Sequence, residues 1–131
     1  MRARVAGVVL LVLALASGVE EAATEPVLRQ LDAFRRNDYD AAYTFASADI
    51  HRLFGRAEFE AMVKRGYPEI ADSVRAHVAG TRVSADDHVY VVVKVRGANG
   101  QQIEALYEVI REGGAWKINA VVSKPDPGED A

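Results

Sequence analysis

The sequence predicts a single α+β domain in which three N-terminal helices pack on a strongly curved four-stranded antiparallel sheet. Apolar residues recur at helical spacing in the first half of the chain, and four runs of alternating residues fill the second half. Helices that precede the strands, rather than alternate with them, are typical of α+β folds. We expect the sheet to curl over the helices as a half-open cone with an apolar cavity inside.

Residues 1–23 have the layout of a secretory signal peptide. Two arginines precede the apolar run 5–16, and small residues suited to cleavage lead us to expect a cut after Ala16 or after Ala23. The run is shorter than the roughly 20 residues that a spanning helix needs. We therefore expect export to the periplasm or outside the cell, without a stable membrane span after cleavage. A leader retained as an anchor is the alternative.

Composition excludes several classes of function. The 131 residues include no cysteine, which excludes disulfides, thiolate chemistry and lipoprotein anchoring. Removing residues 1–16 deletes two of the 16 basic residues and none of the 19 acidic ones, which gives 14 − 19 = −5. Such a mildly acidic domain lacks the basic surface that nucleic acids require, so we expect no nucleic-acid partner.

The first helix of the domain is predicted to begin at Thr24 and to end near Asn37. Thr24 is suited to be its N-cap, and Pro26 would stand in the first turn, where its missing N–H costs nothing. Apolar residues then follow at helical spacing. They are Val27, Leu28, Leu31 and Phe34.

Two further helices are predicted before the strands. Asp38 is suited to cap a short second helix, which residues 47–49 should end. Residues 49–55 are expected to form a connection that mixes apolar and polar groups. A third helix should cover residues 56–65, because its apolar stripe is followed by the stop signal Gly66 and then by a proline.

Four strands are predicted after the helices. They are expected at residues 73–83, 88–96, 101–111 and 115–123. The second strand is the centre of the sheet, since valine occupies every other position in it. Gly80 indicates a bulge or bend in the first strand. Residues 124–131 carry no packing signal and are expected to be a disordered tail.

The turns between these strands predict the register of the sheet. A three-residue loop with Gly100 in the left-handed conformation places Val95 opposite Ile103. A two-residue turn at 113–114 sets the next hairpin. Its expected pairs are Arg111–Trp116, Val109–Ile118, Tyr107–Ala120 and Ala105–Val122. One face then becomes almost wholly apolar, whereas a two-residue first turn would put two glutamates on it.

The opposite face of the predicted sheet is also rich in apolar side chains. Its candidates for a dimer interface are Tyr90, Val92, Leu106, Ile110 and Val121. A solvated face needs less apolar surface than this, and such patches often mark interfaces. We therefore expect a homodimer.

Seven segments of the chain, taken in order, form a pattern that resembles a known family. They are residues 27–34, 41–47, 54–55, 59–63, 66–68, 106–109 and 114–118. The pattern resembles the bacterial family catalogued as domain of unknown function 4864, which is similar to the nuclear transport factor 2-like (cystatin-like) superfamily. The resemblance covers roughly residues 27–122 and implies the α+β cone described above.

The chain departs from the family pattern at three places. Ala48 stands where a proline is usual, Arg56 where a serine would cap a helix, and residues 119–120 where Asp-Gly is usual. The family has no established catalytic residues, so the resemblance implies none here. In the wider superfamily some members are isomerases, dehydratases or hydrolases, and many only bind or dimerise, so the fold does not decide the function.

Asp49 and His51 are the candidates for catalysis that the sequence offers. A carboxylate two residues from an imidazole could orient it as a general base, although the simpler role for Asp49 is to cap a turn. An isomerase- or dehydratase-like enzyme using this pair with a tyrosine is one alternative function.

Aromatic side chains are the candidates for contact with a ligand in the cavity. They are Tyr43, Tyr67, Tyr107 and Trp116. The tyrosine hydroxyls could orient a carbonyl group, but core tyrosines more often bond backbone atoms, and Trp116 is likewise more typical of a core residue.

The three histidines lack metal-ligand spacing, and no phosphate loop or dinucleotide fingerprint occurs, so we expect no metal and no cofactor. The sequence favours a non-enzymatic module that binds a small apolar ligand or dimerises. A structural partner of another envelope protein is a further alternative.

Overall fold

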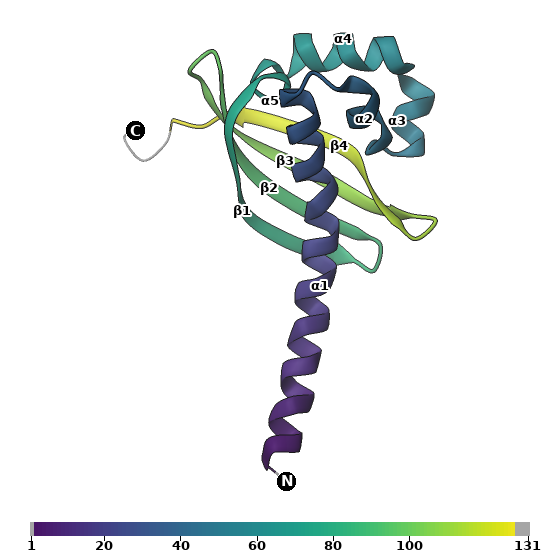
Figure 1. The fold of residues 1–131 in the computed structure, drawn as a ribbon, viewed down its shortest axis with the longest axis vertical. Coiled ribbons are helices and arrows are strands. Elements are labelled where there is room, and N and C mark those ends of the chain that lie inside the picture. The colour runs from purple at the N-terminus through teal and green to yellow at the C-terminus, as the bar shows by residue number, and fades with distance from the viewer. Residues whose placement is uncertain (1, 128–131) are drawn as a thin grey trace.

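The computed structural model describes residues 2–127, with side chains from Gly18 onward. Helices pack on one face of a single antiparallel sheet of order β1-β2-β3-β4, which confirms the predicted α+β class (Figure 1). The helices are α1 (Arg2–Arg35), α2 (Tyr39–Thr44), α3 (Ala48–Leu53), α4 (Arg56–Gly66) and α5 (Pro68–Ala71). The strands are β1 (Ser73–Ala85), β2 (His88–Gly97), β3 (Gln102–Glu112) and β4 (Ala115–Pro125). The described helices number five, where three were expected.

Helix α1 begins far upstream of the predicted start at Thr24. That residue lies inside the helix, where its hydroxyl donates to the Glu20 carbonyl at 2.7 Å, and Pro26 is also internal. Among the side chains that the structure describes, the buried stripe of α1 starts at Ala23, which has no exposed surface, so the packed part of the helix already includes the residue before Thr24. Figure 1 shows α1 crossing the sheet and projecting beyond it at its N-terminal end. Among the described residues, no helix is long and apolar enough to cross a membrane.

Four short helices gather over one end of the sheet (Figure 1). Asp38 caps α2 as predicted, its carboxylate accepting from the Ala41 N–H at 3.1 Å. Helix α3 was not expected, because residues 47–49 were interpreted as a helix stop. Ser47 is instead its N-cap, and its hydroxyl accepts from the Ile50 N–H at 3.3 Å. The helix predicted at 56–65 is confirmed as α4.

The first two hairpins of the sheet have the predicted features. Val95 lies opposite Ile103, and Gly100 has a φ of 83°, so the three-residue turn is confirmed. The predicted irregularity at Gly80 is also present, since the pairing of β1 with β2 shifts by one residue between Val78 and Gly80.

The last hairpin departs from the prediction at a bulge. Its turn is right, since Arg111 pairs with Trp116 and Val109 with Ile118. Asn119 is then skipped, because Glu108 pairs with Ala120. The remaining pairs are Tyr107–Val121, Leu106–Val122 and Ala105–Ser123, so the predicted Tyr107–Ala120 and Ala105–Val122 pairs are wrong. One extra residue in a strand turns every later side chain to the other face.

Because of the bulge, Val122 lies on the outer face of the sheet in place of the predicted interface residue Val121. Val121 packs partly buried against the core, whereas Val122 is 65% exposed. Strand β4 also runs to Pro125, further than the expected start of the tail, and residues 128–131 lie outside the described residues.

The core is concentrated between α1 and the two central strands. Its largest fully buried apolar side chains are Val27, Leu31, Val89, Val91, Val93, Val95, Tyr107 and Val109. Four of them are alternate residues of β2, as the predicted register requires.

Candidate functional site

A cavity of about 330 Å³ lies between the helices and the inner face of β3 and β4. Its walls are mainly apolar and come from α1, α3, α4, α5 and the two strands. The lining residues are Gln30, Phe34, Ala46, Ile50, Phe54, Phe59, Met62, Val63, Tyr67, Ile70, Tyr107, Ile118, Asn119, Ala120 and Val121. None of these carries a formal charge, and a volume of this size is at the lower end for small-molecule sites.

Tyr107, a predicted ligand contact, lines this cavity from β3. Its side chain has no exposed surface, and its hydroxyl has no hydrogen-bond partner. Burial raises the pKa of Tyr107 well above its ordinary value near 10, and the neighbouring Tyr67 adds to the rise. The group therefore stays a protonated donor.

The other polar side chains in the cavity wall have partners. Tyr67, a second predicted contact, donates its hydroxyl to the Val121 carbonyl at 3.0 Å. The Gln30 amide donates to the Ala42 carbonyl at 3.1 Å. These bonds fix the helices and the edge strand in place around the cavity.

Asn119, the bulged residue of β4, joins the sheet to α3. Its amide nitrogen donates to Glu108 at 2.6 Å, and its amide oxygen accepts from the buried Ser47 hydroxyl at 2.8 Å. Ser47 N–H also donates to the Ile118 carbonyl at 2.8 Å. The bulge thus places the N-cap of α3, and with it one wall of the cavity.

Tyr43 and Trp116, the other two predicted contacts, do not line the cavity. The Tyr43 hydroxyl donates to the Phe54 carbonyl at 2.6 Å, so it acts as a structural tyrosine. Trp116 is half-buried on the inner side of β4, and the Arg111 guanidinium lies 5.9 Å from its ring centre.

The two catalytic candidates are not brought together. The Asp49 carboxylate forms an ion pair with Arg52, one turn along α3. The exposed His51 instead stacks on Tyr43 with ring centres 4.0 Å apart, and its Nε2 lies 2.7 Å from the Tyr43 carbonyl oxygen. A carboxylate that orients the imidazole is therefore missing from this geometry.

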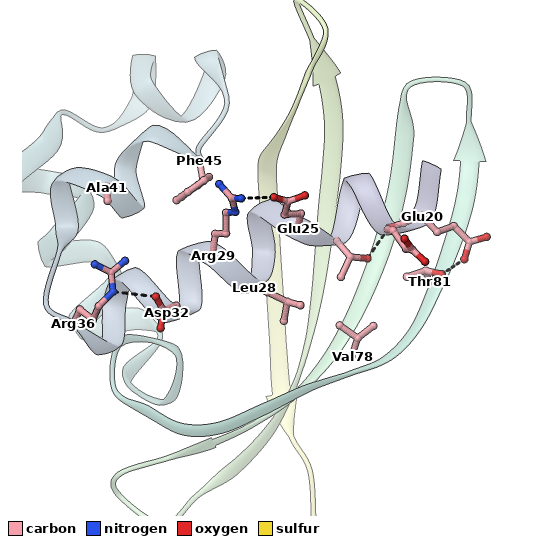
Figure 2. Close-up of a pocket in the computed structure, with 12 residues that line it drawn as sticks. Glu20, Glu25, Leu28, Arg29, Asp32, Arg36, Ala41, Phe45, Val78 and Thr81 are labelled. Carbon is pink, nitrogen blue, oxygen red and sulfur yellow. Dashed lines mark hydrogen bonds and ion pairs between the residues drawn. The ribbon is translucent and has the colours of Figure 1, made fainter. Parts of the chain in front are cut away.

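A second, wider hollow of about 1000 Å³ runs along α1 and β1 (Figure 2). Charged side chains dominate it, and they pair with one another along the helix. Figure 2 shows the Arg29–Glu25 pair, at 2.6 Å, and the contact of Glu20 with Thr81 of β1. The Glu20–Thr81 contact attaches this part of α1 to the sheet, whereas the Arg29–Glu25 pair lies within the helix. Among the described residues, no cluster of three metal-binding side chains occurs.

The family whose description is "Domain of unknown function (DUF4864)" matches residues 20–131 of the chain. The chain belongs to this family. No curated protein matches it. The DUF4864 match starts at Glu20, whose carboxylate accepts a hydrogen bond from Thr81 of β1, and it excludes most of the predicted leader.

Solved structures support the cone assignment of this DUF4864 domain. An NTF2-like protein of unknown function from Silicibacter pomeroyi DSS-3 is similar with a TM-score of 0.62 at 20% identity, covering 85% of this chain and 98% of that one. An NTF2-like protein of unknown function from Shewanella baltica OS155 has a TM-score of 0.56 at 13% identity, covering 82% of this chain and 94% of that one. A SEC-C motif containing protein from Rhodopseudomonas palustris has a TM-score of 0.51 at 13% identity, covering 79% of this chain and 89% of that one. At these identities the likeness shows the fold alone.

The sequence did not indicate two polar residues of the cavity wall, Asn119 and Gln30. Asn119 was noted only as a departure from the family pattern, and a bulge leaves no periodic signal. Gln30 falls on the buried stripe of α1, where its spacing alone could have indicated a buried polar group.

Proposed function

We propose that this chain is a non-enzymatic binding domain that takes a small, largely apolar ligand in the cavity between its helices and β3–β4. The observation that carries the proposal is the 330 Å³ cavity, whose lining includes no charged side chain. A mostly apolar wall with a few polar groups is the usual make-up of a small-molecule site. The separation of Asp49 from His51 favours binding over acid–base catalysis.

Adjacent residues on opposite faces of β4 provide the test. Tetralin, an uncharged bicyclic hydrocarbon, is added to the protein, and the melting temperature and amide NMR shifts are followed. The native chain should be stabilised, since a ligand that binds only the folded state raises its stability. Val121→Phe fills the cavity wall and should abolish the effect, whereas Val122→Phe, on the outer face, should retain it. Equal responses from the two variants would place the probe elsewhere.

We also propose that the domain is exported and that its leader is cut after Ala16 rather than after Ala23. Cleavage at the second site would remove the fully buried Ala23 and the Glu20 contact with Thr81. Cleavage at the first site keeps both. The intact mass of protein recovered from the periplasm or medium tests this, because a chain beginning at Ser17 is expected, and one beginning at Thr24 would contradict it.

A second copy of the chain is the proposed partner for the outer face of the sheet. Val92, Leu106 and Val122 lie side by side across three strands, and Leu106 and Val122 are 40% and 65% exposed. This row supports the expected dimer, with Val122 in place of Val121 and with Tyr90 and Ile110 beside it. Sedimentation velocity should show a dimer that Val92→Glu converts to a monomer. A native chain that is monomeric at micromolar concentration would refute it.

A further inference from the structure

The buried hydroxyl of Tyr107 is the one feature of the cavity wall that the fold itself does not use. Its oxygen is buried and has no hydrogen-bond partner within the described part of the chain, and Tyr107 is one of the residues that line the cavity. A buried polar group without a partner is costly, and native proteins retain few of them. A phenylalanine would fill the same space without that cost.

We propose that the Tyr107 hydroxyl donates a hydrogen bond to the carbonyl-type acceptor of an uncharged ligand. This inference rests on the proposed function and adds the chemical class of the ligand, which is a compact apolar body with one ketone, aldehyde, ester or amide oxygen. The acceptor would give the hydroxyl the partner that it lacks in the unliganded protein.

The surroundings of Tyr107 favour a neutral acceptor over an anion. Its pKa is raised by burial, so the hydroxyl is a donor across the physiological range and beyond it. The cavity lining offers no cationic side chain, so a carboxylate or phosphate would lose its hydration without a countercharge. A neutral carbonyl oxygen loses much less on entering such a site.

The neighbouring tyrosine cannot take this role without losing its own hydrogen bond to the sheet. The Tyr67 hydroxyl is already engaged by the Val121 carbonyl and thereby ties α4 to the edge strand β4. The Tyr107 hydroxyl is buried, so neighbouring lining side chains have to shift before a ligand can contact it. Met62 is the most adaptable of these, because it is unbranched and only half-buried.

Two probes of nearly the same shape test the inference, namely tetralin and its ketone 1-tetralone. Dissociation constants are measured by NMR titration for the native chain, Tyr107→Phe and the matched control Tyr67→Phe. In Tyr107→Phe, binding of 1-tetralone should weaken about fivefold while tetralin is unchanged, since the net worth of one hydrogen bond is about 1 kcal/mol. Tyr67→Phe should leave the ratio of the two constants at its native value.

Each outcome separates this inference from the function on which it rests. If Tyr107→Phe changes both dissociation constants equally, or changes neither, Tyr107 does not donate to the ligand carbonyl, while binding in the cavity stands. If neither probe binds the native chain at millimolar concentration, both binding in the cavity and the hydrogen bond from Tyr107 are wrong. A second measurement needs no variant: the Cζ carbon resonance of Tyr107 should shift with saturating 1-tetralone and stay in place with tetralin.

Discussion

The inner face of the sheet has a packed half and a hollow half. Over β2, the stripe of α1 that includes Val27 and Leu31 meets four valines, and all of these side chains are fully buried. Over β3 and β4, short helices leave a cavity whose wall holds an unpaired hydroxyl. The same sheet therefore supports two kinds of interior, one that stabilises the domain and one that holds the cavity proposed to bind a ligand.

The difference comes from the lengths of the helices. Helix α1 presents one continuous apolar stripe, which can interdigitate with alternate residues of a strand. Helices α3 and α5 have only six and four residues, and α3 contains no fully buried side chain. Helix α3 is held by its Ser47 cap, and α5 follows Tyr67, whose hydroxyl bonds to β4. Helices this short leave the space between them and the sheet unfilled.

Truncation of one apolar side chain in each half should have unequal costs. Leu31→Ala, in the packed half, should lower the free energy of unfolding by about 2–5 kcal/mol, because it opens a cavity in a close-packed region. Met62→Ala, beside the existing hollow, should cost less than about 1.5 kcal/mol, since fewer contacts are lost. Urea denaturation measures both. Equal losses would mean that the second half is as tightly packed as the first.

Removal of the bulge amide should weaken the hollow half alone. Asn119→Ala leaves Ser47 and Glu108 without their shared partner and should cost about 1–3 kcal/mol. Hydrogen exchange should rise in α3 and stay unchanged in β2. The control is Asn99→Ala in the exposed turn between β2 and β3, which should have a smaller effect on stability. Uniform acceleration across the domain would show that the two halves unfold together.

Alkaline pH should destabilise the native chain more than Tyr107→Phe. The folded-state pKa of Tyr107 is raised, so above pH 10 the unfolded chain loses a proton that the folded chain keeps. This contribution to stability is full below pH 10 and falls by about 1.4 kcal/mol per pH unit above it. Urea denaturation from pH 9 to 11 should therefore give a steeper decline for the native chain. Parallel declines would contradict the burial of this hydroxyl.

The smallest effect is expected at the pair that the sequence offered for catalysis. Asp49→Ala removes an exposed carboxylate whose partner is Arg52, and exposed ion pairs contribute little. Neither the melting temperature nor tetralin binding should change measurably. Loss of binding in this variant would place Asp49 in the ligand site, although it does not line the cavity.

The packed half was predictable from the sequence because periodic signals define it. Alternating valines and the left-handed Gly100 turn are local, and together they set the register from Val89 to Val95 correctly. The hollow half depends on single contacts between distant residues. The Asn119 bulge, which exchanges the faces of Val121 and Val122, has no periodic signature.

The candidate ligand residues were predicted in part for the same reason. Inward orientation could be inferred for Tyr107 from the register of β3, and the structure places it in the cavity wall. The hydrogen-bond partners of the tyrosine hydroxyls could not be inferred from the sequence, so Tyr43 and Tyr107 were equally good candidates for contact with a ligand. Only the fold shows that one hydroxyl reaches the Phe54 carbonyl and the other reaches nothing.

The most direct test of the account compares the melting temperatures of Tyr107→Phe and Tyr67→Phe without ligand. Removal of an unpaired buried hydroxyl should raise the melting temperature, by about 4 °C per kcal/mol, whereas loss of the Tyr67–Val121 bond should lower it. Opposite signs would show that the hollow half keeps one donor free for a ligand. A fall of similar size in both variants would mean that Tyr107 already has a partner, and the central claim would be wrong.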